Sequence, residues 1–269
     1  MPRMDGAVER ESGVPDGPSR GARSKRDVDP AYLRLLDAGV VQSRTHVEQM
    51  AMSPTALLRR AFPSLEVDEK QFEALPFITR LRVTGSLLRS EFGVDLDRVD
   101  RCWVSDTVRG WLAMSVASDE ERSLDQVVRG LLQYARDDHF AVREWAWLAA
   151  RPMVCRRPQE ALEVLAEVVQ STDPRERRFA IELTRPRSVW GSHIRDFKVA
   201  PEQAAFLLNA VRCDSSGYVR TAVGNWLNDA AKSRAEWVTA LTGTWLEDCG
   251  CPATAAIVRR GRRSLRSQA

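Results

Sequence analysis

The apolar residues of this chain recur with the period of an α-helix along almost its whole length. Leu33, Leu36 and Val40 share one helical face, and Ser53-Pro54 combines an N-cap with a proline at the first helical position. Alternating patterns bounded by hairpin turns are absent from the sequence. The pattern therefore predicts an all-α protein. Further helices are predicted over residues 76–92, 107–117, 123–136, 140–150, 158–170, 174–184, 201–212, 217–231, 234–246 and 252–265.

An internal repeat accompanies the helical pattern. Successive copies are 34, 35, 42 and 39 residues apart, and several follow an acidic or polar turn. Two helices per unit at such a period are typical of a HEAT-like solenoid with a concave face, which the second helices line. The repeated arginines either face a ligand there or pair with acids of the neighbouring repeat. The repeated dipeptides are Val108-Arg109, Val142-Arg143, Arg177-Arg178, Val219-Arg220 and Val258-Arg259.

Composition divides the chain into a tail and a body. Residues 1–29 are rich in Gly, Pro, Ser and charge, so we expect them to be disordered. The repeat domain is expected over residues 30–265, with a short tail at 266–269. The composition, with 43% hydrophobic and 29% charged residues, is typical of a soluble globular protein. The sequence shows no apolar signal core and no transmembrane segment, so we expect the protein to stay in the cytoplasm.

Neither the overall charge nor the cysteine usage by itself indicates nucleic-acid binding or a metal site. The net charge is +3, but residues 31–257 carry 29 basic and 31 acidic side chains, a net charge of −2. Nucleic-acid binding would therefore need a local basic patch. The five cysteines are scattered, as in a reducing compartment, and Cys249-Gly-Cys251 is their only close pair. We therefore expect no metal site.

Two segments place carboxylates and an indole among arginines. Glu182 follows Arg178 by one helical turn, and Asp229 lies late in a helix that also carries two asparagines. A proline-broken loop then carries Trp190. Basic residues around an aromatic ring can bind the phosphate backbone of a nucleic acid. Carboxylates beside them can stabilise a positive charge that forms within that nucleic acid. The alternative is a surface loop with a packed Trp and ordinary salt-bridge partners.

Four segments carry a resemblance to a known family. They are VVQSRTHVEQMAMSPTALLRRAFP (40–63), DDHFAVREWAW (137–147), DPRERRFAIELTRPRSVWG (173–191) and YVRTAVGNWLNDAAK (218–232). In order and spacing they resemble the AlkC branch of the AlkC/AlkD superfamily, HEAT-like-repeat DNA glycosylases that repair alkylated bases. The resemblance covers roughly residues 31–265.

The resemblance implies a catalytic role for three residues and leaves a fourth position changed. The family's Glu, Trp and Asp match Glu182, Trp190 and Asp229. A further family Glu precedes the Phe-Ala-Val-Arg segment, where this chain has His139. Either Asp138 or Glu144 compensates, or one transition-state carboxylate is missing.

The resemblance also implies the reaction. It predicts a monofunctional glycosylase of base-excision repair that acts on cationic N-alkylated bases, 3-methyladenine above all, in double-stranded DNA. No metal or organic cofactor is expected, and the protein is expected to act as a monomer on nucleoid DNA. The alternative is a non-catalytic HEAT-repeat protein that binds unusual DNA structures or a protein partner. Candidate DNA-binding residues are Arg143, Arg178, Arg185, Arg187, Arg195, Arg220 and Arg259.

Overall fold

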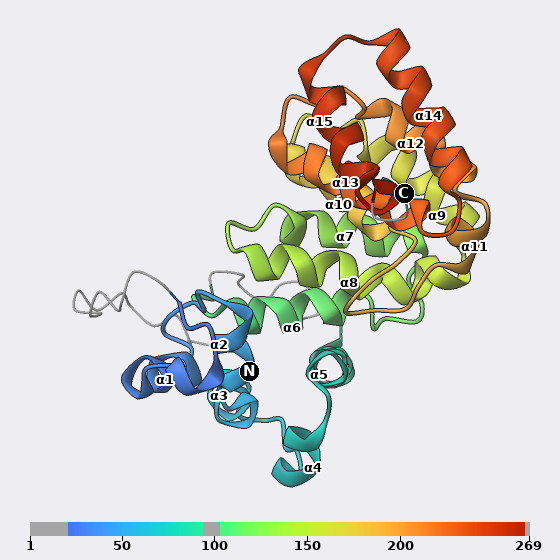
Figure 1. The fold of residues 1–269 in the computed structure, drawn as a ribbon. Coiled ribbons are helices and arrows are strands. Elements are labelled where there is room, and N and C mark those ends of the chain that lie inside the picture. The colour runs from blue at the N-terminus through green and yellow to red at the C-terminus, as the bar shows by residue number, and fades with distance from the viewer. Residues whose placement is uncertain (1–20, 94–102, 267–269) are drawn as a thin grey trace. The chain divides into compact units, whose positions relative to one another are not determined.

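A computed structural model describes residues 21–93 and 103–266 of the chain (Figure 1). Every regular element in these two ranges is a helix, so the predicted all-α class is confirmed. Among the described helices, none is both long and apolar enough to cross a membrane. The chain divides into two compact units, residues 1–120 with 139–145 and residues 121–138 with 146–269. Helix α8, Phe140–Arg156, contributes residues to both units.

The first unit packs its helices around Leu58, Leu88 and Val108, which are completely buried. Ser53 caps α3 as predicted, because its hydroxyl accepts a hydrogen bond of 3.2 Å from the backbone N–H of Ala56. Helices α5 and α6 pack against each other in this unit. The elements are the 3-10 turn η1 Lys25–Asp27 and the helices α1 Pro30–Asp37, α2 His46–Ala51, α3 Pro54–Ala61, α4 Glu69–Ala74, α5 Phe77–Phe92 and α6 Asp106–Val116.

Part of the expected N-terminal tail belongs to this first unit. Residues 1–20 lie outside the described residues. Within residues 21–29, the backbone N–H of Ala22 donates to the Glu48 carboxylate at 3.0 Å, and Val28 is buried. The Thr45 hydroxyl also donates to the Ala22 carbonyl at 3.0 Å. Side chains from α2 and its cap therefore satisfy backbone groups of this segment, which packs with the first unit.

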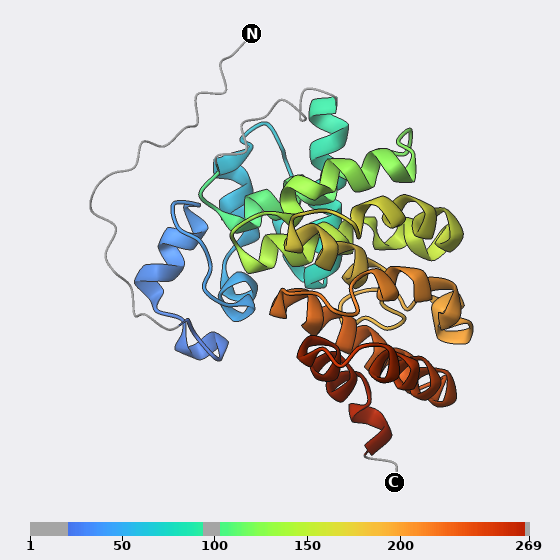
Figure 2. The same cartoon turned by 90° about the horizontal axis from the view of Figure 1, so that it is seen from above.

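The second unit stacks helices in consecutive contact, as a repeat predicts. Helix α10 contacts α7 and α13, and α13 contacts α15. Figures 1 and 2 show α10, α13 and α15 lying side by side. The elements are α7 Leu124–Ala135, the rest of α8, α9 Pro158–Val168, α10 Pro174–Leu183, α11 Arg195–Val199, the 3-10 turn η3 Pro201–Ala204, α12 Ala205–Ala210, α13 Gly217–Ala231, α14 Ala235–Asp248, α15 Pro252–Gly261 and α16 Arg263–Arg266.

Two glycines bring α13 and α15 unusually close together. A Cβ atom on Gly224 would lie 2.8 Å from the Cβ of Arg260, and one on Gly261 would lie 2.8 Å from the Cβ of Leu227. Both distances are shorter than non-bonded carbon atoms tolerate. The lack of a side chain at these two glycines therefore allows α15 to pack this closely against the helix that carries Asp229.

Arg109, Arg177 and Arg220 each close the turn before their own helix. Arg109 donates to the carbonyls of residues 103 and 104, at 2.6 and 2.7 Å. Arg177 and Arg220 repeat this bond to the carbonyls six and five residues earlier, with distances between 2.6 and 3.0 Å. Arg177, and not Arg178, is therefore the equivalent of Arg109 and Arg220. The repeat register predicted at this unit was wrong by one residue.

Arg177 also joins neighbouring repeats. Its Nε and Nη2 atoms donate to the two carboxylate oxygens of Asp214, at 2.7 and 3.0 Å. Asp214 lies in the turn that Arg220 closes, so one bidentate pair links two consecutive turns. This is the pairing with a neighbouring acid that the sequence left open as the alternative to ligand binding.

Some helix boundaries differ from the prediction. Helix α8 was expected to end at residue 150, but it continues to Arg156 with Pro152 inside it. Proline removes one helical hydrogen bond, yet the adjoining Met153 and Val154 are buried, and their packing outweighs that local cost. The single helix predicted over 201–212 is a 3-10 turn followed by the short helix α12.

Candidate active site

Two candidate catalytic carboxylates meet in the second unit on adjacent helices. Glu182 is the last residue but one of α10, and Asp229 lies in the last turn of α13. Both are buried, with 3% and 5% of their surfaces exposed. Burial and the negative end of a helix dipole both disfavour a carboxylate. A strong local source of positive charge must therefore hold these groups in place.

That charge is the guanidinium of Arg185, which bridges the two carboxylates. Its Nη1 donates to Glu182 Oε2 at 3.0 Å, and its Nε and Nη2 both donate to Asp229 Oδ2, at 3.0 and 2.7 Å. Burial alone would lower the pKa of Arg185, but the two carboxylates outweigh it and raise the pKa above its ordinary value. One cation thus keeps two like charges side by side.

Further cations surround the remaining carboxylate oxygens. Arg178 lies 3.4 Å from Glu182 Oε1, and its guanidinium also stacks 4.4 Å from the ring centre of Tyr218. The Lys232 ammonium lies 3.4 Å from Asp229 Oδ1. Glu182 Oε1 and Asp229 Oδ1 are therefore held less tightly than the two oxygens bound by Arg185. The acids and these cations together give a locally basic cluster, although residues 31–257 are slightly acidic overall.

Arg187 fastens the end of α13. Its Nε donates to the Asp229 carbonyl at 3.2 Å, and its Nη2 donates to the Ser233 hydroxyl at 2.6 Å. Carbonyls in the last turn of a helix lack partners within the helix, so the guanidinium supplies one. Arg187 therefore fixes the backbone that carries the Asp229 carboxylate.

The loop with Trp190 is held by Arg151, a residue that sequence reasoning missed. Arg151 is fully buried in α8, and its guanidinium donates to the carbonyls of Leu183, Arg185 and Ser192 at 3.2, 2.7 and 2.6 Å. Burial lowers the pKa of Arg151 to about 10. An arginine inside the apolar stretch WAWLAARPMV was the available signal, because a charge buried there needs partners.

Trp190 itself is half-buried beside this anchor. A Cβ atom on its neighbour Gly191 would lie 3.1 Å from Cδ of Arg151, so the loop passes directly over that side chain. Val189, the preceding residue, is 90% exposed. The loop therefore presents its tip to solvent while Arg151 fixes its base.

The candidate DNA-binding arginines differ in their exposure and in their internal contacts. Arg178, Arg185, Arg187 and Arg220 make the internal contacts described above. Arg195 and Arg259 are exposed, the first at the start of α11 and the second on α15, and Arg143 is half-buried. The role of all seven in DNA binding stays a prediction, and the exposed pair is the better placed for phosphate.

His139 serves the first unit as a buried polar anchor. Its Nδ1 accepts from the N–H of Ala141 at 3.3 Å, so Nε2 carries the proton that it shares with the Ser43 carbonyl at 2.6 Å. The buried Asp106 carboxylate lies 3.6 Å from Nδ1 and accepts three hydrogen bonds from Ser43 and Gln49. His139 therefore ties the 43–49 segment to the start of α8.

The two acids proposed to compensate for His139 lie near the surface. The Asp138 side chain is 97% exposed and pairs with Arg175 at 2.9 Å. Glu144 is half-buried in the second turn of α8. Compensation by either acid stays a prediction.

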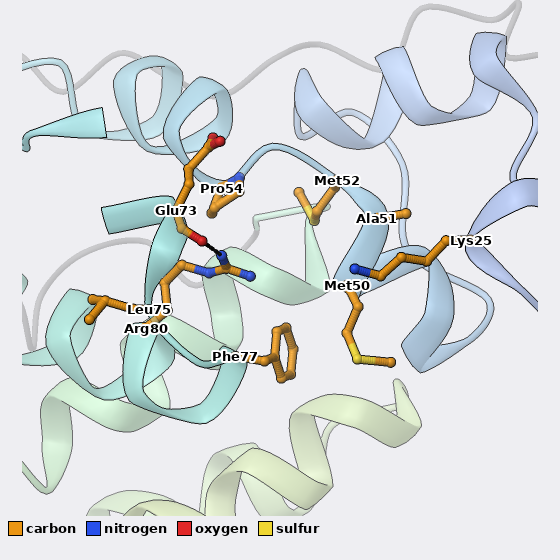
Figure 3. Close-up of a pocket in the computed structure, with 9 residues that line it drawn as sticks. All are labelled: Lys25, Met50, Ala51, Met52, Pro54, Glu73, Leu75, Phe77 and Arg80. Carbon is orange, nitrogen blue, oxygen red and sulfur yellow. Dashed lines mark hydrogen bonds between the residues drawn. The ribbon is translucent and has the colours of Figure 1, made fainter. Parts of the chain in front are cut away.

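The first unit contains a pocket that is lined by other residues. It encloses about 380 Å³ and is lined by the two methionines Met50 and Met52, Phe77 and Arg80, among others (Figure 3). Arg80 donates to the Glu73 carbonyl at 3.1 Å across one side of it. None of the candidate catalytic residues lines this pocket, so we do not assign the site there.

Comparison with known proteins places the chain near one solved structure. The Pseudomonas fluorescens alkylpurine DNA glycosylase AlkC, bound to DNA containing an abasic site analog, matches with a TM-score of 0.63 and 25% sequence identity, over 92% of this chain and 66% of that one. The likeness confirms the resemblance to the AlkC branch. The uncharacterized protein YhaZ of Bacillus subtilis (strain 168) is 29% identical over 117 residues, 44% of this chain and 32% of YhaZ. No protein-family model matches the chain.

Proposed function

We propose, on the premise that this chain is an AlkC-like protein, that it is a DNA repair glycosylase that releases cationic N-alkylated bases from double-stranded DNA. The chain spans about two thirds of the AlkC chain that it matches, with 66% of that length covered. The observation that carries the proposal is the buried pair Glu182 and Asp229, held together by Arg185. The expected substrate is 3-methyladenine.

The carboxylate pair suits the charge that develops in this reaction. Alkylation at N3 or N7 makes a purine a cationic leaving group, and its departure leaves oxocarbenium character on the sugar. A carboxylate near that charge stabilises the transition state more than the ground state. At ~4 Å and an effective dielectric constant of ~20, one such charge pair contributes up to ~4 kcal/mol, about a thousandfold in rate.

The geometry supports different tasks for the two oxygens of each carboxylate. Arg185 occupies Oε2 of Glu182 and Oδ2 of Asp229 and so orients both groups. The less tightly held Oε1 and Oδ1 are left to face the sugar or to accept a proton from the attacking water. A preoriented pair does not have to rearrange during the reaction, which is the advantage of a preorganised site.

Trp190 and the surrounding arginines complete the proposal. An indole face placed against a cationic base contributes ~1–2 kcal/mol through cation–π attraction. The arginines supply contacts to phosphate, and their number sets the salt dependence of binding. Arg151 anchors the loop, so the indole and the carboxylates are supported by the same structural unit.

The test is release of methylated bases from duplex DNA by the purified chain. We expect Glu182→Gln and Asp229→Asn each to slow base release by about 10²–10³-fold. The matched control is Glu176→Gln, which changes another buried carboxylate of α10 that pairs with Arg136 instead of Arg185. The catalytic assignment is wrong if both site variants release base as fast as the parent protein.

A non-catalytic repeat protein is the alternative function. His139 in the position of a family carboxylate supports it, because the structure uses this side chain to hold Ser43. Tight, salt-sensitive DNA binding without base release would favour this alternative. If the chain binds no DNA at low salt, both DNA functions fail, and a protein partner remains.

A further inference from the structure

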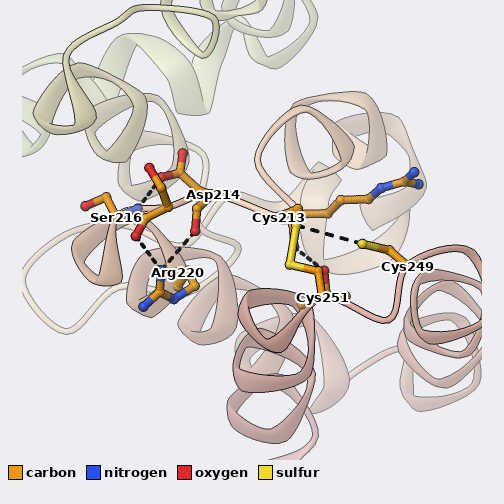
Figure 4. The surroundings of a disulfide bond; sticks show 9 residues. Cys213, Asp214, Ser216, Arg220, Cys249 and Cys251 are labelled. Atoms are coloured by element: carbon orange, nitrogen blue, oxygen red, sulfur yellow. Dashed lines mark hydrogen bonds between the residues drawn. A yellow bond between two sulfur atoms is a disulfide. The ribbon is translucent and has the colours of Figure 1, made fainter.

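Three cysteines from two loops of the second unit converge at one surface position. Cys213 lies between α12 and α13, whereas Cys249 and Cys251 lie between α14 and α15. Their sulfur atoms all lie within 4.8 Å of one another (Figure 4). From the sequence we expected no metal site, because the cysteines are scattered along the chain. The sequence pattern did not predict the cluster, because 36 residues separate Cys213 from Cys249 and only the stacking of helices brings the two loops together.

The third sulfur is the informative one. Cys213 and Cys251 form a disulfide, and this bond needs no other cysteine. Cys249 nevertheless places its sulfur 3.8 Å from that of Cys213. Thiolates bound to tetrahedral zinc lie about 2.3 Å from the metal and therefore about 3.8 Å from each other. The spacing of Cys249 thus fits a shared metal ligand set.

We propose that the reduced form of this cluster binds one thiophilic divalent cation of the zinc class through Cys213, Cys249 and Cys251. A dithiol reductant supplies the two electrons and two protons that convert the Cys213–Cys251 bond into two thiols. Metal binding then releases the thiol protons and forms three metal–sulfur bonds. The Cys213 side chain is exposed and the other two are half-exposed, so water fills the fourth position of the tetrahedron.

Contacts other than sulfur atoms also join the two loops. Arg212, next to Cys213, extends toward the loop that carries the other two cysteines and lies 3.4 Å from Asp248. The Arg212 backbone carbonyl also accepts a 2.9 Å hydrogen bond from the buried Thr254 hydroxyl of α15. The two loops are thus already joined without the sulfur atoms.

This site is distant from the carboxylate pair. Cys213 lies four residues before the start of α13, and Asp229 lies in the last turn of that 15-residue helix, about 20 Å away along its axis. The metal would therefore fasten consecutive repeats and take no part in base release. Its binding can fail or succeed independently of the proposed glycosylase function.

The experiment uses the full chain, reduced and freed of metal, and titrates it with Co²⁺ and then with Zn²⁺. We expect one Co²⁺ per chain, a near-ultraviolet thiolate-to-cobalt charge-transfer band, and displacement of the band by Zn²⁺. Cys249→Ser should weaken Zn²⁺ binding at least about 10-fold, as should Cys213→Ser and Cys251→Ser. Cys155→Ser, which changes a cysteine of α8 outside the cluster, is the matched control and should bind as the parent does.

Cys249→Ser decides between a metal site and a disulfide alone, because only the metal site needs this residue. Equal Zn²⁺ affinity in Cys249→Ser and the parent would overturn the proposal, as would the absence of a charge-transfer band in the reduced parent. A second measurement needs no variant. Zn²⁺ should protect three thiols of the reduced parent from a thiol reagent, and protection of fewer than three contradicts the site.

Discussion

Arg185 donates two hydrogen bonds to a single oxygen of Asp229, although 44 residues separate them in the chain. The third hydrogen bond of the same guanidinium goes to Glu182, three residues earlier on α10. One side chain thus joins the ends of two helices from consecutive repeats. The relationship explains how two buried carboxylates coexist, and it makes Arg185 as important to the site as the acids.

Replacing Arg185 tests this bridge. Arg185→Ala leaves two buried carboxylates without their shared cation, so we expect the free energy of unfolding to fall by about 3–5 kcal/mol. Arg185→Lys keeps the charge but lacks the forked geometry of the guanidinium, so its free energy of unfolding should fall by less. The matched control is Arg187→Ala, whose guanidinium contacts a carbonyl and a hydroxyl instead of carboxylates. Urea unfolding of the four proteins measures the effect. An Arg185→Ala loss no larger than that of Arg187→Ala would contradict the bridge.

The buried Arg151 predicts an unusual dependence of stability on pH. Its pKa is lowered to about 10 in the folded protein by burial and keeps its ordinary, higher value in the unfolded chain. Below about pH 10 the guanidinium of Arg151 is charged in the folded state, and the burial of this charge opposes folding. As the pH rises through about 10, the folded protein releases this proton before the unfolded chain does, so this contribution shifts in favour of folding.

Arg151→Leu removes this titration and the three hydrogen bonds to the loop. We expect the variant to lose about 2–4 kcal/mol at neutral pH, because buried carbonyls lose their donors. The gap in free energy of unfolding between parent and variant should then widen from about pH 8 to about pH 11. Urea unfolding across that range checks it, since other titrating groups are common to both proteins. A gap that stays constant or narrows would show that Arg151 keeps its ordinary pKa.

Substitutions of the exposed arginines should weaken DNA binding, whereas substitution of an internally bonded arginine should lower stability. Arg195→Ala and Arg259→Ala each remove an exposed charge, so we expect weaker DNA binding and a salt slope reduced by about one unit, with stability unchanged. Arg220→Ala removes two hydrogen bonds to turn carbonyls and should cost about 1–3 kcal/mol of stability instead. Fluorescence anisotropy at several salt concentrations, together with thermal unfolding, distinguishes the two groups. A salt slope unchanged by both surface substitutions would remove Arg195 and Arg259 from the DNA contact.

Restoring the family carboxylate at residue 139 should not increase the rate of base release. His139→Glu places a second acid beside Asp106, whose carboxylate lies 3.6 Å from the present ring, and removes the donor to the Ser43 carbonyl. We expect a loss of stability of several kcal/mol and no gain in base release. His139→Gln retains an N–H donor and should be milder. Faster base release by His139→Glu would instead identify this position as a catalytic one that the chain has lost.

Local sequence determined most of the helices, because apolar periodicity and capping are properties of neighbouring residues. Ser53 and Pro54 began a helix as predicted, and the period of the repeated arginines indicated stacked units. The positions of Glu182 and Asp229 followed from the resemblance carried by their segments. Their sharing of one buried cluster supports that interpretation.

Only the tertiary structure decided which partners these residues take. Arg151 reaches three carbonyls more than 30 residues away, and Cys213 meets cysteines of a later loop through the stacking of helices. Arg177 replaced Arg178 as the repeat equivalent, since hydrogen bonds to turn carbonyls and not residue type define the position. The chain's own chemistry specifies which side chains need partners. The packing of distant segments decides which partner each one finds, because burial makes an unpaired polar group costly wherever it lies.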